Sequence, residues 1–158
     1  MYDTMDSQKE YLSKDKFEEL KDELDDLMTH KRKEIAEQLE AAKSLGDLSE
    51  NAEYHSAREA QAAMEERISV LENILKNATV ISSRHKTDAV SIGSTVKVAR
   101  GKEVKTYTIV GSEEADIAAG KISNKSPLGE AVFGRRKGDK FKCSTPRGEE
   151  DCEILDIN

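Results

Sequence analysis

The chain has 158 residues, of which 36% are charged and 4% aromatic, with no Trp and a formal net charge of −7. This composition is sufficient for one or two small domains and suits an exposed rod better than one large apolar core. Apolar runs of only a few residues exclude a membrane-spanning helix, and without a signal peptide we expect a soluble, cytoplasmic protein. The first ten residues are polar and unpatterned, and we expect them to form a frayed leader.

Two amphipathic patterns follow in the first half of the chain. Apolar residues spaced three and four apart predict one helix from about Ser13 to Ser44 and a second from about Leu48 to Lys76. Because the connection is short, the two helices can bury their apolar stripes only against each other, as an antiparallel hairpin. About 28 residues per helix give a rod of roughly 40 Å. We therefore expect residues 1–78 to form a coiled-coil hairpin with its tip at about residues 44–51.

The tip of this hairpin contains two acidic residues, Asp47 and Glu50. One interpretation is structural, because their spacing fits a capping box and acidic residues in a first turn are favoured by the helix dipole. The other interpretation is that both carboxylates face outward as hard oxygen ligands for Mg²⁺. Two residues on one turn cannot complete a metal site, so the ion would be shared with a site on another molecule.

The charge divides unevenly along the chain. Before Ser82 there are 11 Lys and Arg against 20 Asp and Glu, and after Ile81 there are 14 against 12. The expected hairpin is therefore acidic, at −9, and the rest is slightly basic, at +2. Binding to the duplex backbone depends on basic charge, so the hairpin is not expected to bind DNA unaided. Any contact with nucleic acid must be local, or made inside a partner that supplies the positive charge.

The second half has the pattern of a small sheet. We expect a linker and a first short strand at residues 79–88, followed by a globular domain at 89–158, so that the whole chain has an α+β fold. The expected elements are strands at Val90–Val98, Thr106–Val110, Asp139–Thr145 and Asp151–Ile157, a β-turn at Arg100–Glu103 and a short helix at Pro127–Gly134.

The two cysteines lie on the last predicted hairpin. If it turns at Arg147-Gly148, Cys143 and Cys152 face each other across its strands. Pro146 weakens that register because it cannot donate a ladder hydrogen bond. In a reducing cytoplasm we expect two free, partly buried thiols rather than a disulfide. Without a C-x-x-C motif or clustered histidines, we expect no zinc site.

Several segments together identify a family. They are Asp47-Leu48-Ser49-Glu50-Asn51-Ala52-Glu53-Tyr54 with the following residues to Gln61, and later Gly93-Ser94-Thr95-Val96, Tyr107-Thr108-Ile109-Val110-Gly111, Glu114-Ala115-Asp116, Ile122-Ser123 and Ser126-Pro127-Leu128-Gly129. From about Leu12 to the C-terminus, the chain closely resembles the bacterial transcript cleavage factors of the GreA/GreB family. The resemblance implies an FKBP-like fold for residues 89–158. Only Tyr107, Phe133 and Phe141 are available to line an isomerase pocket, so prolyl isomerase activity is not expected.

The resemblance also implies a function. The chain has no nucleophile with a matching base and no phosphate-binding glycine-rich loop, so we do not expect it to be an enzyme on its own. The hypothesis is that the tip enters the secondary channel of backtracked bacterial RNA polymerase. There Asp47 and Glu50 would help hold a Mg²⁺ shared with the polymerase and order the water that cleaves the nascent RNA 3′ end. No cofactor would be bound tightly by the chain alone, and we expect a monomer with no membrane partner.

Three residues are candidates for contact with RNA. Lys43 and Arg58 match basic positions that the family is understood to use against extruded RNA. Each could instead be a solvated residue in an i,i+4 pair, for example Lys43 with Asp47. Tyr54 could stack on a base or ribose, or it could pack the end of the coiled coil.

Four residues are candidates for contact with polymerase. At the tip, Ser49 and Asn51 could orient water or RNA inside the channel. The loop at Ser126-Pro127 aligns with the part of the family that contacts the rim of the channel. Its alternative is an ordinary turn with Pro127 at the first position of a helix.

Two other functions are compatible with the residues. A relative of the same fold could occupy the channel without promoting cleavage, although the unaltered tip acids argue against it. A structural or chaperone-like coiled coil would use Asp47 and Glu50 only as helix caps, and their loss would then lower stability by about 1 kcal/mol.

Overall fold

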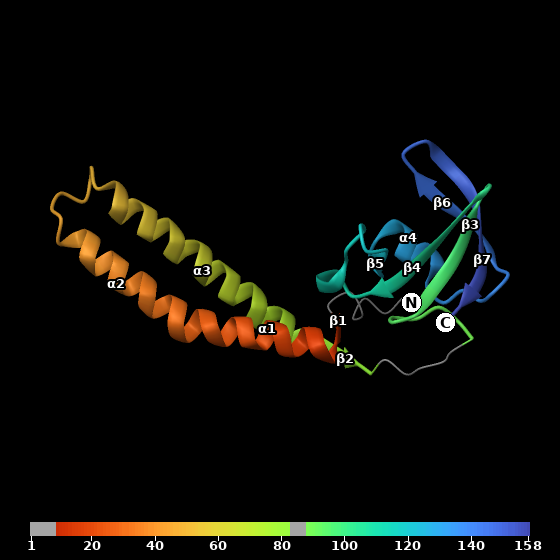
Figure 1. Ribbon diagram of the computed structural model, residues 1–158, viewed down its shortest axis with the longest axis horizontal. Helices are drawn as coiled ribbons and strands as arrows, with labels where there is room; N and C mark the ends of the chain where they lie inside the picture. The colour runs from red at the N-terminus through yellow and green to blue at the C-terminus, as the bar shows by residue number, and fades with distance from the viewer. Residues whose placement is uncertain (1–8, 83–87) are drawn as a thin grey trace, which may run out of the picture. The chain divides into compact units, whose positions relative to one another are not determined.

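The computed structural model describes residues 9–82 and 88–158, which belong to two compact units. The hairpin unit comprises Phe17–Asn77, and the sheet unit combines residues 9–16 with 78–82 and 88–158 (Figure 1). The predicted α+β class is confirmed. Most of the predicted leader and residues 83–87 of the predicted linker lie outside the described part of the chain. Within the described ranges, every helix is too short or too polar to span a bilayer.

The first arm of the hairpin is not one continuous α-helix as predicted. It consists of α1 (Lys14–Asp26), the π-helical turn η2 (Leu27–Lys31) and α2 (Arg32–Lys43). In η2 the backbone N–H of Arg32 donates to Leu27 O, five residues earlier. Eight residues separate Leu27 from Ile35, one more than the seven-residue seam spacing of a coiled coil. The wider π turn accommodates the extra residue.

The second arm, α3 (Ala52–Asn77), runs antiparallel to the first, which confirms the hairpin (Figure 1). Arg32 donates to both carboxylate oxygens of Glu65, at 2.9 and 2.7 Å. Nearer the base, Arg67 does the same to Glu23, at 2.7 and 2.9 Å. The two arms share an apolar core of Ile35, Met64 and Ile68, with Leu24, Leu27 and Leu39 packed against it.

A two-stranded parallel sheet joins the ends of the hairpin within the sheet unit. Its strands are β1 (Glu10–Ser13) and β2 (Ala78–Ile81). Placing Glu10 in an unpatterned leader was therefore wrong, because its backbone pairs with a strand far along the chain. A Cβ atom on Gly111 would lie 1.7 Å from Tyr11 O, so only glycine allows β1 to approach this closely.

The start of α1 is held by side chains of the sheet unit. Ser13 Oγ accepts from Lys16 N at 3.2 Å and so caps the helix. The Glu114 carboxylate in turn accepts from Ser13 N at 2.9 Å and from Ser13 Oγ at 2.6 Å. Lys125 Nζ lies 2.6 Å from a carboxylate oxygen of Glu10, which is on β1 together with Ser13.

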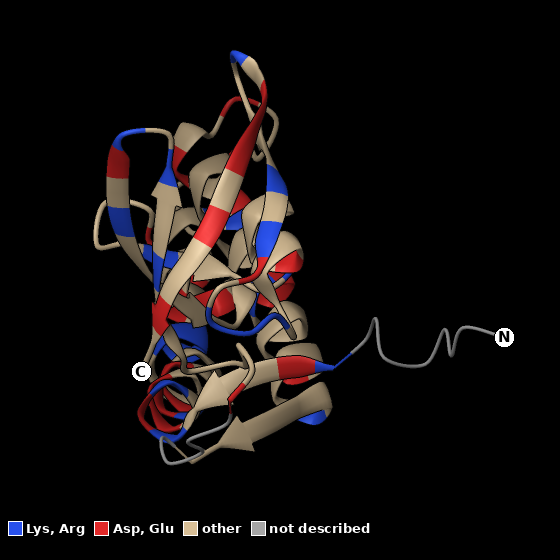
Figure 2. Cartoon of the chain, turned by 90° about the vertical axis from the view of Figure 1, so that its right-hand side faces the viewer, with Lys and Arg blue, Asp and Glu red and all other residues tan. Residues whose placement is uncertain are grey.

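The main sheet has five strands in the order β5-β4-β3-β7-β6. Its core is formed by Val90, Val96, Val98, Ile109, Ile122, Val132, Phe141, Cys143, Cys152 and Ile154. Figure 2 shows acidic and basic residues interspersed along its strands. The elements of the unit are β3 (Thr95–Arg100), β4 (Glu103–Val110), the 3₁₀ turn η3 (Ser112–Glu114), β5 (Lys121–Ser123), α4 (Pro127–Val132), β6 (Lys140–Thr145) and β7 (Gly148–Ile157).

Several elements of the sheet unit differ from the prediction, and two strands are longer: β4 starts at Glu103 rather than Thr106 and β7 at Gly148 rather than Asp151. The first strand starts at Thr95 rather than Val90, because the chain turns at Gly93, which has φ of 89°. The short strand β5 was not predicted as a strand, since three residues are too few to show a period. The helix α4 ends at Val132 because Phe133 is already extended and Gly134 has φ of 76°. The predicted β-turn after Arg100 is confirmed by the pairing of Arg100 with Glu103.

The expectation of two free thiols was wrong, and the register considered for the last hairpin does not form. The last hairpin pairs Thr145 with Gly148, so the loop is Pro146-Arg147 and the register differs by two residues from the one considered. Pro146 takes a loop position because it has no N–H for the ladder. Cys143 and Cys152 are consequently diagonal neighbours, with Cα atoms 6.0 Å apart, and they form a disulfide rather than two free thiols.

Candidate functional site

The loop at residues 44–51 joins α2 to α3 at the far end of the hairpin unit. Ser44 Oγ donates to Ala41 O at 2.6 Å as α2 ends. Gly46 then has φ of 118°, a region that favours glycine and lets the chain reverse. Every residue from Ser44 to Glu50 is exposed, so the loop presents its side chains to the surroundings.

Asn51 starts the second helix and fastens it to the first. Its Oδ1 accepts from Tyr54 N at 3.0 Å, which is an N-cap bond, and its Nδ2 donates to Ala42 O at 2.6 Å. The predicted start of α3 at about Leu48 was therefore wrong, and of the two interpretations of Asp47 and Glu50, the capping box does not form. An Asn side chain has both an acceptor for the cap and a donor for the Ala42 carbonyl at the end of α2, which also accepts from Leu45 N at 3.2 Å, and a carboxylate cannot provide both.

Asp47 is engaged with its own loop instead. Its Oδ1 accepts from Ser49 N at 2.9 Å and from Ser49 Oγ at 2.8 Å, which is an Asx turn. These two hydrogen bonds lower the pKa of Asp47 from its ordinary value. The larger effect comes from the backbone amide of Ser49 and the smaller one from its hydroxyl. The Asp47 side chain is therefore an exposed carboxylate at neutral pH, held in one orientation by its neighbour.

Together with exposed Glu50, Asp47 gives the tip two carboxylates on one short loop. Hard divalent cations prefer oxygen ligands of this kind. In the described part of the chain, no cluster of three or more His, Cys, Asp or Glu side chains could hold a metal ion. The donor set thus fits a Mg²⁺ ion only if further ligands come from another molecule.

The three candidate RNA contacts lie on the helices that flank the loop. Lys43 is in the last turn of α2 and Arg58 is near the start of α3, and both are exposed. Arg58 Nη1 donates to Gln61 Oε1 at 3.4 Å, and the recorded bonds of Asp47 go to Ser49 rather than Lys43. Tyr54 is half-buried, with its ring edge-on to His55 and 5.9 Å between ring centroids.

The Ser126-Pro127 loop lies in the sheet unit and has a clear structural role. Ser126 Oγ accepts from Gly129 N at 3.1 Å and donates to Ser123 O at 2.7 Å, so it caps α4 with Pro127 at the first helical position. A Cβ atom on Gly129 would lie 1.9 Å from Ser123 O. The loop is therefore tightly built, while Pro127 itself stays exposed.

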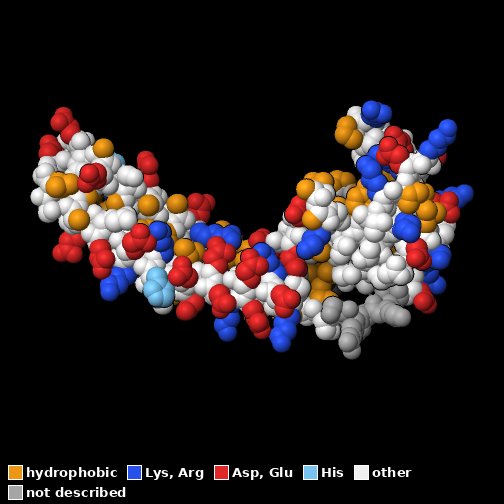
Figure 3. All heavy atoms as spheres, viewed as in Figure 1, with side chains coloured by type: hydrophobic (Ala, Val, Ile, Leu, Met, Phe, Trp, Pro, Cys, Tyr) orange, Lys and Arg blue, Asp and Glu red, His pale blue; other side chains and the backbone are white. Residues whose placement is uncertain are grey.

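Sequence reasoning missed an open groove between the two helices beside the tip. The exposed Leu45 is part of its lining, and Figure 3 shows apolar side chains among the acidic ones at this end of the hairpin. Alanines at positions where the helices approach are the sequence feature that indicates such a groove. Its lining includes Ala41, Ala42, Leu45, Ala52, Ala57 and Ala60.

Comparisons with known proteins cover nearly the whole chain. Residues 10–80 match the family model described as transcription elongation factor, N-terminal, and residues 85–158 match transcription elongation factor, GreA/GreB, C-term. Transcription elongation factor GreA of Chlorobaculum tepidum is 48% identical over 151 residues, which are 93% of this chain and 95% of that protein. The protein of the same name from Geobacillus kaustophilus is 46% identical over 158 residues, covering 97% and 99%. Among solved structures, GreA factor homolog 1 (Gfh1) of Thermus thermophilus is 26% identical with a TM-score of 0.45, covering 95% of this chain and 99% of that one.

Proposed function

The chain belongs to the GreA/GreB family of transcription elongation factors, and from this we propose that it rescues arrested bacterial RNA polymerase by stimulating cleavage of backtracked RNA. The tip at residues 44–51 enters the secondary channel of the polymerase. Asp47 and Glu50 act there on the extruded RNA 3′ end. The chain is not an enzyme by itself, because the phosphodiester is cleaved in the active site of the polymerase.

The observation that supports this proposal most directly is that neither tip acid caps α3. Asn51 performs that structural role, and both carboxylates are exposed on the loop. In a coiled coil that used these acids as caps, a carboxylate of the tip would accept the N-cap hydrogen bond that Asn51 accepts here. The two hydrogen bonds from Ser49 keep Asp47 ionised and oriented without a cation of its own.

Asp47 and Glu50 are the residues of this chain that would hold a Mg²⁺ ion jointly with the polymerase. When bound, the ion supplies Lewis-acid stabilisation of charge on the phosphodiester oxygens. The chain contributes carboxylate oxygens that position a water molecule, and Ser49 fixes the orientation of one of them. Asn51 keeps the loop seated on the ends of both helices.

Other candidate residues would contribute binding. Lys43 and Arg58 would attract the RNA backbone, and Tyr54 would stack on a base with its exposed part. Ser126 and Pro127 would contact the rim of the channel through a loop that is already ordered before binding. In this proposal the protein acts as a monomer in the cytoplasm.

The test uses purified backtracked elongation complexes with 3′-labelled RNA and Mg²⁺. We expect Asp47→Asn combined with Glu50→Gln to abolish release of short 3′ fragments while binding of the factor to polymerase is retained. Glu53→Gln combined with Glu59→Gln is the matched control, because it removes two exposed carboxylates from the neighbouring part of α3. If the tip variant cleaves as well as the unaltered protein, the proposed role of the acids is wrong. If no form stimulates cleavage although all bind, the protein occupies the channel without promoting hydrolysis.

A further inference from the structure

The sheet unit contains a second chemical group, the Cys143–Cys152 disulfide, for which the tip mechanism has no use. We propose that this pair is a reversible redox modification site, which a dithiol reductant reaches through a pocket in the sheet unit. Reduction then releases the covalent link within the β6–β7 hairpin. The chemistry of this site is separate from that of the tip.

The strand register places the link diagonally on one face of the hairpin. Phe141 pairs with Cys152 and Cys143 pairs with Glu150, so the two cysteines are offset by two residues and project to the same side. Among the described strands, β6 lies at one edge of the sheet and pairs with β7. The disulfide is therefore the one covalent connection across the last ladder of the sheet, and breaking it leaves the ladder hydrogen bonds in place.

Both cysteines face a pocket. They are 4% and 2% exposed, so the protein surface around them offers little direct access. A small pocket lies over this face, however, and the two cysteines are part of its lining. Val98, Tyr107 and Leu128 form its apolar wall. In the proposal, a small reductant approaches the sulfur atoms from this pocket without unfolding of the unit.

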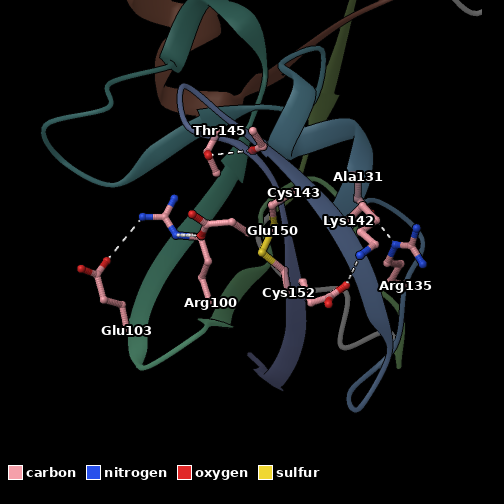
Figure 4. The surroundings of a disulfide bond; sticks show 11 residues. Arg100, Glu103, Ala131, Arg135, Lys142, Cys143, Thr145, Glu150 and Cys152 are labelled. Atoms are coloured by element: carbon pink, nitrogen blue, oxygen red, sulfur yellow. Dashed lines mark hydrogen bonds and ion pairs between the residues drawn. A yellow bond between two sulfur atoms is a disulfide. The ribbon is translucent and has the colours of Figure 1, made fainter.

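One cation of the pocket lies beside one cysteine. Arg100 pairs with Cys152 across β3 and β7, and residues paired in this way project to the same face. Figure 4 shows its guanidinium turned toward Glu150 and Glu103, with ion-pair distances of 3.3 and 3.4 Å. Because Arg100 is the strand partner of Cys152, we expect its positive charge to favour the Cys152 thiolate and so to make Cys152 the leaving group.

The exchange follows from this asymmetry. A thiolate of the dithiol attacks Cys143 Sγ, the Sγ–Sγ bond breaks, and its electron pair leaves on Cys152 Sγ. The second thiol of the reductant, as its thiolate, then attacks the mixed disulfide and releases Cys143 as a thiolate. With two protons taken up by the two cysteines, the protein gains two thiols while the dithiol becomes a cyclic disulfide. Such a cycle suits a protein of the reducing cytoplasm, a setting that rests on the proposed function.

The first experiment measures access to the bond in the native protein. The oxidised protein is treated with dithiothreitol without denaturant, alkylated with iodoacetamide and weighed by mass spectrometry. We expect both cysteines to be alkylated, and the disulfide to re-form when the reductant is removed and oxidised dithiothreitol is added. If alkylation requires denaturant, the bond is a permanent crosslink and the proposal is overturned. The same holds if the reduced protein does not reoxidise.

The second experiment separates the contribution of Arg100 from general effects of charge. Arg100→Gln is expected to slow native reduction about threefold, because the Cys152 thiolate becomes a poorer leaving group. Lys105→Gln is the matched control, since it removes another cation of the pocket lining that pairs with Val98 rather than with a cysteine. Equal rates for the two variants would overturn the assignment of Cys152 as the leaving sulfur.

The consequence for the fold is measured by thermal unfolding. The cysteines are nine residues apart in sequence, so the bond closes a short loop and restricts the unfolded chain. Reduction removes this restriction and is expected to lower the Tm of the sheet unit by about 10 °C. Cys143→Ser combined with Cys152→Ser should unfold at the temperature of the reduced protein and should not respond to dithiothreitol. Identical Tm values for the oxidised and reduced protein would show that the redox state does not affect the hairpin. Neither this measurement nor the previous two involves polymerase, so their failure is distinct from failure of the tip mechanism.

Discussion

At the scale of single residues, the tip depends on Asn51, which bonds to Tyr54 N and to Ala42 O. We expect Asn51→Ala to lower the free energy of unfolding of the hairpin by about 1–2 kcal/mol, because it removes an N-cap and one of the two donors to the Ala42 carbonyl. Urea titration followed by the helical circular dichroism signal measures this change.

The matched variant is Asn51→Asp, which keeps the cap acceptor and loses only the donor to Ala42 O. It should be less destabilising than Asn51→Ala, and the difference isolates the cap. If both variants are as stable as the unaltered protein, the bridge between the helices contributes nothing measurable.

The second residue-scale prediction concerns the titration of Asp47. Hydrogen bonds from the Ser49 amide and hydroxyl lower its pKa in the folded protein. The stabilisation is therefore present above the pKa of the unfolded chain and is lost as pH falls through the folded value. Ser49→Ala should raise the pKa of Asp47 only part of the way to its ordinary value, because the larger effect comes from the backbone amide. Carboxyl-carbon NMR of the side chain measures this directly.

A convenient internal reference is Asp156, whose pKa is lowered chiefly by its hydrogen bond with Lys137 in the sheet unit. Its titration should be unaffected by Ser49→Ala. A full return of Asp47 to its ordinary pKa would mean that the backbone bond is absent in solution.

At the scale of elements, the hairpin should be stabilised by its apolar core far more than by the ion pairs beside it. The Arg32–Glu65 pair is roughly half exposed on both sides and screened by solvent, so Arg32→Gln is expected to lower stability only slightly, and less at high salt. Ile68 is 4% exposed, and Ile68→Ala is expected to cost about 3 kcal/mol at any salt concentration. Urea unfolding at low and high NaCl distinguishes the two effects. A cost for Arg32→Gln as large as that for Ile68→Ala would contradict this ranking.

Elements determined by neighbouring residues could be predicted from the sequence, and elements determined by pairing with distant residues could not. The two arms of the hairpin repeat a local apolar period, so their existence was predictable from the sequence. β1 was not, because four residues such as Glu10–Ser13 become a strand only by pairing with β2 much later in the chain. At the tip, exposure of Asp47 and Glu50 was predictable, but spacing could not decide whether Asp47 or Asn51 caps α3. That choice depends on the carbonyl of Ala42, which a linear pattern does not place nearby.

At the scale of the whole molecule, Glu114 connects a helix start to the sheet unit through its two bonds to Ser13. Glu114→Gln replaces a charged acceptor by an amide with one acceptor oxygen, so at least one of these bonds is lost. We expect amide exchange in β1 to become about tenfold faster, which corresponds to the loss of one charge-assisted hydrogen bond. Hydrogen–deuterium exchange with mass spectrometry resolves the peptide that contains Glu10–Ser13.

Glu113→Gln is the control for this measurement, since it alters the neighbouring residue of the same 3₁₀ turn and removes the same charge. Its exchange in β1 should match that of the unaltered protein. Equal acceleration by both variants would indicate a general effect of charge rather than the bonds to Ser13.

The π turn at Leu27–Lys31 also sets the direction in which later side chains of the arm point around the helix axis. Eight α-helical residues would rotate Ile35 roughly 80° past Leu27, off the buried stripe. The wider turn removes that excess, and both side chains pack in the same core. Inserting or deleting one residue elsewhere in α2 would rotate everything after it by about 100°, the tip acids included. The direction in which Asp47 and Glu50 point is thus determined by the number of residues in a turn near the middle of the arm, so homologous hairpins should vary in length only where this rotation is compensated.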